Sequence, residues 1–319
     1  ISLLSDPIFI FSGWFGFLVH SKMHTSSSLF QCRSRTPFVS FQGSRVVQGK
    51  KKTSSWKNSS TRRTHPLVVS ASIKPEKVAS GSVSFVLLAG GVGKRMGANM
   101  PKQYIPLRGQ EIALWSLDII SALDEVGEVV VVCDPSYEDV FTGAQDKGLC
   151  HGKPLTFAAP GAERMDSVEN GLSACDESKT LVCIHDSARP LVRPDDVRKC
   201  MQDAKTHGAA VLGVKCKATV KQAQPVGDDS LVMVAQTLDR STLWEMHTPQ
   251  IIEPQLLKRG YAHVREVGAE VTDDVSIVEA IGEPVIITED SYENLKVTTP
   301  EDLVAAEGIL DSRAATVTA

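Results

Sequence analysis

Residues 83–103 read VSFVLLAGGVGKRMGANMPKQ, and the rest of the chain is interpreted from them. The first six residues form an apolar run interrupted by Ser84 alone, which predicts a strand buried on both faces. Three glycines follow, and glycine lets backbone N–H groups approach an anion closely because it carries no Cβ. Arg95 and Lys102 add two cations to the same region. The stretch therefore predicts a loop that binds a polyphosphate.

The glycine pattern does not match two common nucleotide-binding motifs. It does not end in the Gly-Lys-Ser/Thr of a Walker A motif, and it lacks the third glycine of the dinucleotide-binding fingerprint. A nicotinamide dehydrogenase is disfavoured as well. Such enzymes carry an acidic residue about 20 residues after the loop, whereas Asp134 lies about 40 residues away.

From Ser82 onward, short apolar runs alternate with helical patterns, which predicts an α/β fold with a mostly parallel sheet and helices on both faces. Ligands of such sheets bind at the carboxyl ends of the strands, where the glycine loop falls. Three of the helices begin with proline, a residue favoured in the first turn. The predicted strands are 82–89, 128–133, 155–158, 181–185 and 209–214. The predicted helices are 113–123, 164–175, 194–207, 254–267, 273–280 and 300–310.

The segment at about 216–241 breaks this alternation. Two stretches of alternating polar and apolar residues flank the turn at 225–230, which predicts an inserted β-hairpin arm. The arm either folds back on its own domain or reaches into a second subunit. The alternation is compatible with both arrangements.

Charge is distributed unevenly along the 319 residues. The first eighty contain twelve Lys or Arg but only Asp6 and Glu76 as acids, and they are rich in Ser and Thr. We interpret 1–80 as a disordered N-terminal transit segment, with a serine content that favours a plastid over a mitochondrion; a plain solvated tail is the alternative. Residues 1–22 are interpreted as untranslated or incomplete sequence ahead of a start at Met23.

The remaining residues carry about 22 basic and 36 acidic side chains. An acidic body disfavours a nucleic-acid-binding surface, and a phosphate site in it requires a local basic pocket aided by a divalent metal. The apolar stretch 9–19 is too short to span a membrane, so we expect no membrane segment. Seven cysteines form no Cys-x-x-Cys pair, which predicts buried free thiols rather than a zinc site.

The motif His185-Asp-Ser-Ala-Arg-Pro190 follows the apolar run 181–184. A carboxylate at the carboxyl end of a strand, beside a phosphate loop, suits Mg²⁺ because this ion prefers oxygen ligands and shares them with phosphates. Asp186 is therefore the candidate Mg²⁺ ligand, with a turn cap as the alternative. Arg189 either binds phosphate or braces Asp186, and His185 is expected to be structural.

Three other positions carry weaker signals. Ser167 ends a turn at 160–167 that leads into a helix, and it either contacts a base edge or has a structural role as a cap or a polar core residue. Lys296 lies between two apolar residues in a strand-like segment, and because a buried lysine is costly unless paired, an anion contact is favoured. The Asp239-Arg240 pair after the hairpin is typical of a surface ion pair.

Together these motifs resemble one family, the 2-C-methyl-D-erythritol 4-phosphate cytidylyltransferases, in its plant plastid form. The resemblance covers about 82–310 in the family's order. The AGGxGxRM element alone is shared with many sugar-nucleotide pyrophosphorylases, but the combination is specific. The matching segments are LLAGGVGKRMGANMPKQYIPLRGQ (87–110), PGAERMDSVENGL (160–172), VCIHDSARPLV (182–192), TLDRSTLWEMHTPQ (237–250), EVTDDVSIVE (270–279) and NLKVTTPEDLVAAE (294–307).

The resemblance implies a Rossmann-like nucleotidyltransferase fold of the GT-A-like type, with the cytidylyltransferase domain at 81–319. It implies that CTP and 2-C-methyl-D-erythritol 4-phosphate react, with Mg²⁺, to 4-CDP-2-C-methyl-D-erythritol and pyrophosphate. This reaction belongs to the non-mevalonate isoprenoid pathway of the chloroplast stroma. The resemblance also implies a homodimer in which the arm carries an arginine into the site of the second subunit.

The resemblance also implies roles for individual residues. The glycine loop wraps the CTP phosphates, Ser167 lies at the cytosine, and Asp186 binds the metal. The methylerythritol phosphate is held by Arg240, Thr272 and Lys296. The implied catalytic residues are Arg95, Lys102, Arg240 and Lys296. The implied substrate-binding residues are Ala89, Gly90, Gly91, Gly93, Gly161, Asp166, Ser167, Arg189, Arg240, Thr272 and Lys296.

Two alternatives remain open at this point. One is a nucleotidyltransferase of the same fold that acts on another sugar or polyol phosphate. The other is a catalytically silent, nucleotide-binding regulatory subunit. A silent subunit is expected to lose Lys102, Asp186 or Lys296, and the sequence retains all three.

Overall fold

The computed structural model describes residues 76–91, 100–227 and 231–318. The chain divides into two units, and all described residues belong to the second, Leu67–Ala319, which is compact. The predicted transit segment therefore lies almost entirely outside the described residues. Its predicted boundary and its targeting role stay predictions.

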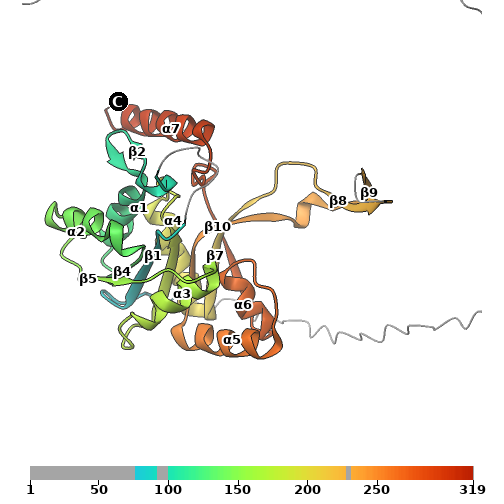
Figure 1. Ribbon diagram of the computed structural model, residues 1–319, viewed down its shortest axis with the longest axis horizontal. Helices are drawn as coiled ribbons and strands as arrows, with labels where there is room; N and C mark the ends of the chain where they lie inside the picture. The colour runs from blue at the N-terminus through green and yellow to red at the C-terminus, as the bar shows by residue number, and fades with distance from the viewer. Residues whose placement is uncertain (1–75, 92–99, 228–230, 319) are drawn as a thin grey trace, which may run out of the picture. The chain divides into compact units, whose positions relative to one another are not determined.

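A seven-stranded sheet with the strand order β11-β7-β10-β6-β1-β4-β5 forms the centre of the second unit (Figure 1). Neighbouring strands pair parallel except for β10, which runs antiparallel to both β6 and β7. The mostly parallel sheet predicted from the sequence is confirmed. The strands are β1 Val83–Leu88, β4 Val126–Val132, β5 Leu155–Ala158, β6 Leu181–Asp186, β7 Ala209–Lys215, β10 Trp244–Ile252 and β11 Ile286–Glu289.

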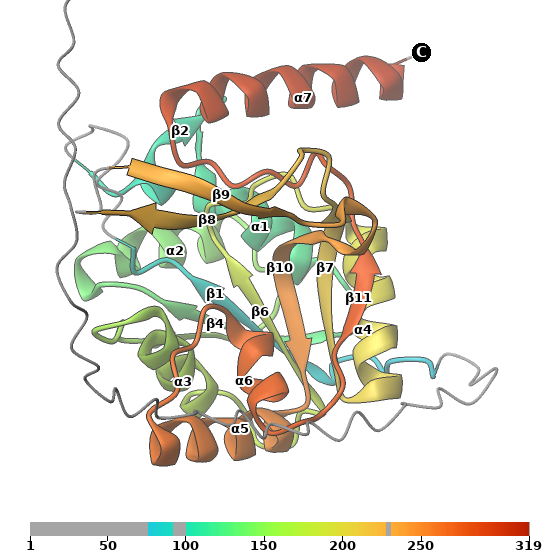
Figure 2. The same ribbon diagram turned by 90° about the vertical axis from the view of Figure 1, so that its right-hand side faces the viewer.

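Helices cover both faces of this sheet, and the two layers can be followed in Figure 2. Successive strand residues point to opposite faces, so in β1 Phe85 packs with α1, α2 and α4, whereas Val86 packs with α3, α5 and α6. Both side chains are fully buried, and each burial contributes about 1.5–3 kcal/mol. The helices are α1 Ile112–Ser121, α2 Glu138–Asp146, α3 Arg164–Ser173, α4 Pro194–His207, α5 Pro254–Val267, α6 Asp274–Ala280 and α7 Pro300–Thr318.

A third, smaller apolar cluster joins α7 to a short antiparallel ribbon. The ribbon consists of β2 Pro106–Leu107 and β3 Gln110–Glu111. Leu107 of the ribbon and Ala306 of α7 are both fully buried in the cluster, together with Val297. The C-terminal helix is therefore attached to the segment that directly follows the glycine loop.

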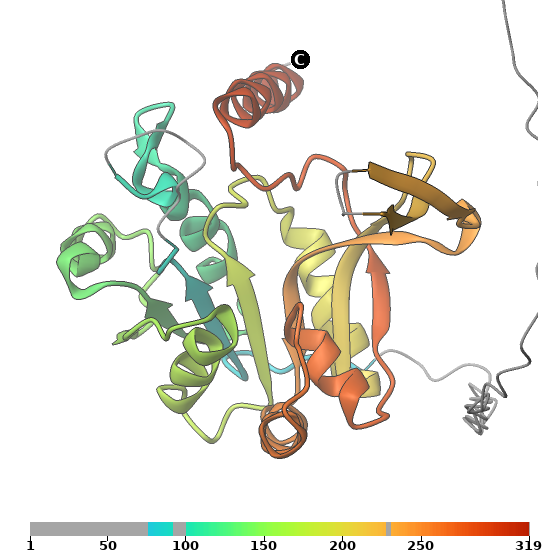
Figure 3. The ribbon, with the colours of Figure 1, turned by 45° about the vertical axis from the view of Figure 1, so that its right-hand side comes forward.

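The predicted hairpin is confirmed as β8 Lys221–Val226 and β9 Leu231–Thr237, which pair antiparallel. It forms a two-stranded sheet of its own and stands apart from the seven-stranded sheet (Figure 3). Every described residue of both strands is exposed, including the apolar Leu231, Val232 and Val234. The arm therefore does not fold back onto its own domain.

Several elements differ from the sequence-based expectation. The strands β10 and β11, the helix α2 and the β2–β3 ribbon were not predicted, and α7 extends beyond the predicted end at 310. Residues 294–298, interpreted as strand-like, pair with no strand. No helix within the described part of the chain has the length and apolar character needed to cross a membrane.

Candidate functional site

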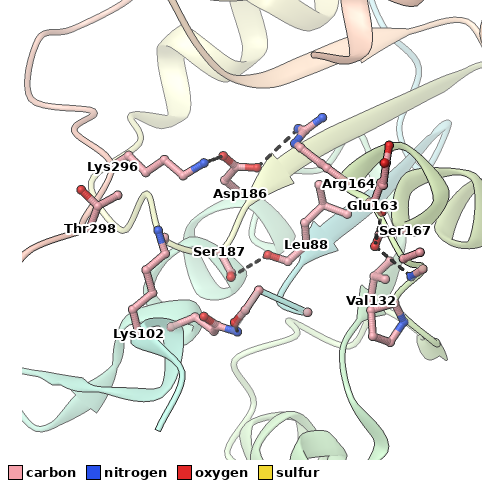
Figure 4. Close-up of a pocket in the computed structure, with 17 residues that line it drawn as sticks. Leu88, Lys102, Val132, Glu163, Arg164, Ser167, Asp186, Ser187, Lys296 and Thr298 are labelled. Carbon is pink, nitrogen blue, oxygen red and sulfur yellow. Dashed lines mark hydrogen bonds and ion pairs between the residues drawn. The ribbon is translucent and has the colours of Figure 1, made fainter. Parts of the chain in front are cut away.

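A pocket of about 420 Å³ opens at the carboxyl ends of β1 and β6 (Figure 4). Its walls come from segments far apart in the sequence: the turn after β1, the short 3-10 helix Lys102–Tyr104, the turn before α3, the end of β6 and the segment before α7. This is the sheet edge at which the sequence predicted a ligand. The pocket brings together the predicted site residues Gly90, Gly91, Lys102, Gly161, Ser167, Asp186 and Lys296.

The carboxylate of Asp186 is held between two cations. Lys296 Nζ lies 2.5 Å from one carboxylate oxygen and Arg164 Nη2 lies 3.4 Å from the other, and they approach from opposite sides in Figure 4. Burial opposes ionisation of Asp186, but the charges of Arg164 and Lys296 outweigh it and hold the pKa of this carboxyl well below its usual range. Asp186 is therefore a carboxylate at any physiological pH.

Lys296 departs from the expected environment. Its side chain is 39% exposed rather than buried, so the cost of burying a lysine does not apply to it. The expected anion partner is nevertheless present, because Asp186 supplies it within the protein. A phosphate that enters the pocket meets Lys296 on its open side.

Arg164 is a site residue that the sequence analysis missed. Its guanidinium makes a bidentate pair with Asp274, at 2.5 Å and 2.8 Å, and the Asp274 side chain is 1% exposed. Arg164 is also the first residue of α3, where the helix dipole disfavours a positive charge. A positive charge at this unfavourable position, within the 160–167 motif, is the feature of the sequence that could have indicated a role for Arg164 in the site.

The turn before α3 is built on Gly161. Its N–H donates to Ser167 Oγ at 3.0 Å, and the Ser167 hydroxyl donates to the Glu163 carbonyl oxygen at 3.1 Å. A Cβ on Gly161 would lie 2.2 Å from Cβ of Asp166, so glycine is required here. Ser167 therefore stabilises the turn and lines the pocket, and its contact with a base edge stays a prediction.

Asp166 and Arg189 do not line the pocket. The Asp166 carboxylate accepts the Glu163 N–H at 3.1 Å, as part of a capping box, and pairs with Arg265 at 3.0 Å. Arg189 is buried and donates from Nη1 to the Asn294 carbonyl oxygen at 2.6 Å. This contact braces the segment at Asn294 rather than Asp186, so both roles left open for Arg189 stay predictions. A substrate contact of either residue stays a prediction.

His185 lies fully buried beneath the site. Its Nε2 is 3.2 Å from the Arg189 carbonyl oxygen, and its Nδ1 is 3.1 Å from Thr248 Oγ1. Burial lowers the pKa of His185 to about 4, so the imidazole is neutral. Thr248 Oγ1 also accepts the Asp186 N–H at 3.0 Å, which fixes the end of β6. These contacts agree with the structural role expected for His185.

Two further predicted residues do not line the pocket, and two lie in a stretch that the structure does not describe. Arg240 is exposed just after the arm and donates to the Lys217 carbonyl oxygen at 2.8 Å, and Thr272 is exposed before α6. Gly93 and Arg95 lie outside the described residues. Their contacts with substrate stay predictions.

Ala89 lies immediately behind the pocket rather than in its wall. It is buried, its N–H donates to the Val132 carbonyl oxygen at 2.8 Å, and its carbonyl oxygen accepts from Gln103 Nε2 at 2.6 Å. Gln103 also lines the pocket, and no role was predicted for it from the sequence.

The side chains of the pocket fit a magnesium ion that is shared with phosphate. Among the described residues, no three His, Cys, Asp or Glu side chains converge on a metal position. Mg²⁺ often needs only one or two carboxylates from the protein, because substrate phosphates and water supply the other oxygens. Asp186 is such a carboxylate, and Glu163 also lines the pocket.

A mostly parallel α/β sheet with a glycine turn after its first strand, and lysines facing a carboxylate at its edge, defines a nucleotidyltransferase-type protein. Comparison with known proteins narrows this class. The sequence model of the family "2-C-methyl-D-erythritol 4-phosphate cytidylyltransferase" matches residues 83–312. The chain belongs to this family.

Individual relatives agree with this assignment. The enzyme of this name described as chloroplastic from Oryza sativa subsp. japonica is 56% identical over 238 residues, which cover 75% of this chain and 77% of the rice protein. The Chlamydia pneumoniae enzyme of this name is 39% identical over 227 residues, which cover 71% of this chain and 98% of the Chlamydia protein.

Solved structures show the same fold. The 4-diphosphocytidyl-2C-methyl-D-erythritol synthase of Anaerococcus prevotii aligns with a TM-score of 0.62 at 26% identity, covering 73% of this chain and 100% of that one. The 2-C-methyl-D-erythritol 4-phosphate cytidylyltransferase of Thermus thermophilus aligns with a TM-score of 0.57 at 29% identity. The alignment covers 72% of this chain and 98% of the Thermus chain.

Proposed function

We propose that this protein transfers a cytidylyl group from CTP to 2-C-methyl-D-erythritol 4-phosphate in isoprenoid precursor biosynthesis. The products are 4-CDP-2-C-methyl-D-erythritol and pyrophosphate. The observation that carries the proposal is a basic pocket, in a chain of this family, that unites Lys102, Lys296, Asp186 and Ser167.

The reaction joins two polyanions, so its main requirements are positioning and positive charge. A phosphate oxygen of the acceptor attacks the α-phosphorus of CTP. One P–O bond forms, the bond to the β-phosphate oxygen breaks, and pyrophosphate leaves with its electron pair. Lys102 and Lys296 enter the pocket from different elements, so they supply charge on more than one side of the reacting phosphates. Gly90 and Gly91 line the same pocket.

We propose Mg²⁺ as the cofactor, held by Asp186 and by the phosphates of CTP. When bound, the ion would neutralise phosphate charge and orient the triphosphate. The support for this is the ionised carboxylate at the end of β6, which faces the pocket and has oxygens of the type that Mg²⁺ prefers.

We also propose a homodimer that forms through the arm. An isolated two-stranded hairpin is marginally stable in water, yet this one exposes a run of apolar side chains. Arg240 follows the arm and does not line the pocket of its own chain. Exchange of arms between two chains would cover the apolar residues and bring Arg240 to the second pocket.

The proposed location is the chloroplast stroma, with the N-terminal segment acting as a transit peptide. The support is the scarcity of acidic residues in that segment and the chloroplastic description of the rice relative.

Pyrophosphate release tests the proposed reaction. The purified protein is mixed with Mg²⁺, CTP and 2-C-methyl-D-erythritol 4-phosphate, beside parallel mixtures with ATP, GTP or UTP and with other polyol phosphates. Release that requires both CTP and 2-C-methyl-D-erythritol 4-phosphate supports the proposal. Release with a different pairing would assign another nucleotidyl transfer, and no release from the folded protein would point to a regulatory subunit.

A further inference from the structure

Gln103 is a buried polar residue at the floor of the glycine turn, with 2% of its surface exposed. Its Nε2 group has two hydrogens, and it donates to the Ala89 carbonyl oxygen at 2.6 Å and to the Gly91 carbonyl oxygen at 2.8 Å. The Tyr104 hydroxyl donates to the same Ala89 oxygen at 3.1 Å. Three hydrogen bonds therefore join the turn after β1 to the 3-10 helix that carries Lys102.

These bonds determine which way the peptide groups of the turn face. In a trans peptide the carbonyl of one residue and the N–H of the next point in opposite directions. The Ala89 carbonyl oxygen points toward Gln103 because it accepts a hydrogen bond from Gln103 Nε2. The Gly90 N–H is therefore directed away from Gln103. Gly90 lines the pocket, and no described residue accepts a hydrogen bond from its N–H. This N–H is therefore a donor that a phosphate in the pocket can use.

The turn is also restrained from the other side. A Cβ on Gly90 would lie 2.6 Å from Cβ of Pro160, so the turn packs directly against the segment that leads to Ser167. Tyr104 stacks on Tyr137, with ring centroids 4.0 Å apart and planes within 4° of parallel. The 3-10 helix is thereby anchored to the core, and Gln103 transmits this anchoring to the turn.

We propose that Gln103 is a positioning residue for nucleotide binding. It orients the Ala89–Gly90 peptide so that the Gly90 N–H is available to the triphosphate, and it holds the turn to the 3-10 helix that carries Lys102. The inference deepens the proposed function and rests on it for the identity of the nucleotide. If Gln103 only filled space, its replacement by a side chain of equal length would leave the orientation of these peptide groups unchanged.

The test replaces Gln103 by a side chain of similar length without donors, Gln103→Met. Affinities for CTP and for CMP are measured by calorimetry, and kcat and KM by pyrophosphate release. Because two hydrogen bonds to the turn are lost, we expect the CTP affinity and kcat to fall by about tenfold or more, with the CMP affinity changed by less than about threefold. The matched control is Gln145→Met on the exposed surface of α2, which should behave as the unaltered protein.

The comparison of CTP with CMP separates positioning from general damage. Equal loss of affinity for both nucleotides would overturn the proposal, and so would unchanged CTP affinity and kcat in Gln103→Met. If Gln103→Met does not fold, Gln103→Glu is measured by the same criteria, since it keeps the shape but lacks the pair of donors. CTP binding without transfer in the unaltered protein would contradict the proposed function while leaving the role of Gln103 measurable. Loss of CTP binding in the unaltered protein would contradict both.

Discussion

The two cations that hold Asp186 differ in how firmly they are themselves held. Arg164 is fixed by its bidentate pair with Asp274 as well as by Asp186, whereas the ion pair of Lys296 is with Asp186 alone among the described residues. Loss of Lys296 would therefore leave the Asp186–Arg164–Asp274 cluster in place. It would remove the cation that is most open to an incoming phosphate.

Lys296→Met is expected to lower turnover by about a hundredfold or more, the usual cost of losing one preorganised charge at a reacting phosphate. Stability should fall by about 1–3 kcal/mol, because the buried Asp186 carboxylate loses one charged partner and keeps Arg164. Pyrophosphate release and thermal unfolding measure the two effects. The control is Lys258→Met, which removes an exposed lysine paired with Glu177 on the surface. Turnover within about tenfold of the unaltered protein would exclude Lys296 from the chemistry.

Two cysteines also allow a prediction at this scale. Burial raises the pKa of Cys133 to about 12, with Glu138 and Asp134 adding to the shift, and burial raises the pKa of Cys175 to about 12. A raised pKa keeps the thiol protonated, and the thiol is a far weaker nucleophile than the thiolate. At mildly alkaline pH the native protein should therefore react with iodoacetamide at Cys216 before the buried Cys133 and also before Cys175, which is partly exposed like Cys216.

Mass mapping of modified peptides measures the order of reaction, and the same protein in guanidinium serves as the reference in which all thiols react. From neutral to mildly alkaline pH, modification of Cys175 in the native protein should stay far slower than in the guanidinium reference, because only a minute fraction of a thiol is ionised so far below a pKa of about 12. Modification of Cys175 as fast as that of Cys216 would show that its thiolate is accessible.

At the scale of elements, the turn before α3 depends on one glycine. Gly161→Ala would place a Cβ 2.2 Å from Cβ of Asp166 and 2.9 Å from its backbone carbon, and neither atom is the end of a flexible side chain. The turn must therefore shift, and Ser167 with it. Overpacking of this kind costs about 1–3 kcal/mol, so we expect a lower Tm together with weaker CTP binding.

Gly143→Ala is the matched control, because a Cβ there meets nothing within 4 Å and alanine is the better helix former in α2. This control should melt at the same temperature as the unaltered protein or higher. A Gly161→Ala protein with unchanged Tm and unchanged CTP affinity would show that the turn tolerates the added atom.

The elements differ in how well they can be predicted from their sequences. β1, β4 and β6 are runs of buried apolar residues and were predicted, because a strand covered on both faces needs no polar side. β10 was missed because it contains Pro249, and proline argues against a central strand. In the structure, Pro249 falls within a break of the β10–β7 register between Met246 and Gln250, so its missing N–H interrupts no regular pairing.

The site was predictable where its chemistry lies in one motif. Asp186 follows a buried strand and Ser167 lies in a glycine-led turn, and both line the pocket. Arg164 and Gln103 act through partners that the sequence does not reveal, namely a carboxylate 110 positions away and the backbone of a turn. Such roles depend on how the chain folds back on itself. Arg240 shows the same limit, because its predicted site belongs to a second chain.

At the scale of the whole molecule, the arm is notable because no other described part of the chain covers it. Side chains of β9 alternate between its two faces, so Val232 and Val234 lie on the same face, and both are more than half exposed. The arm strands pair with each other and with no strand of the seven-stranded sheet. Substitutions on β9 should therefore change association without disturbing the main sheet.

The double variant Val232→Lys/Val234→Lys is expected to shift the protein from dimer to monomer, because four like charges would meet where two arms come together. Its thermal unfolding should stay close to that of the unaltered protein, while turnover falls because Arg240 no longer reaches a second pocket. Sedimentation velocity over a range of concentrations measures association, and Val304→Lys, an equally exposed valine on α7, is the control. A double variant that dimerises as well as the unaltered protein, or an unaltered protein that is monomeric throughout, would refute assembly through the arm.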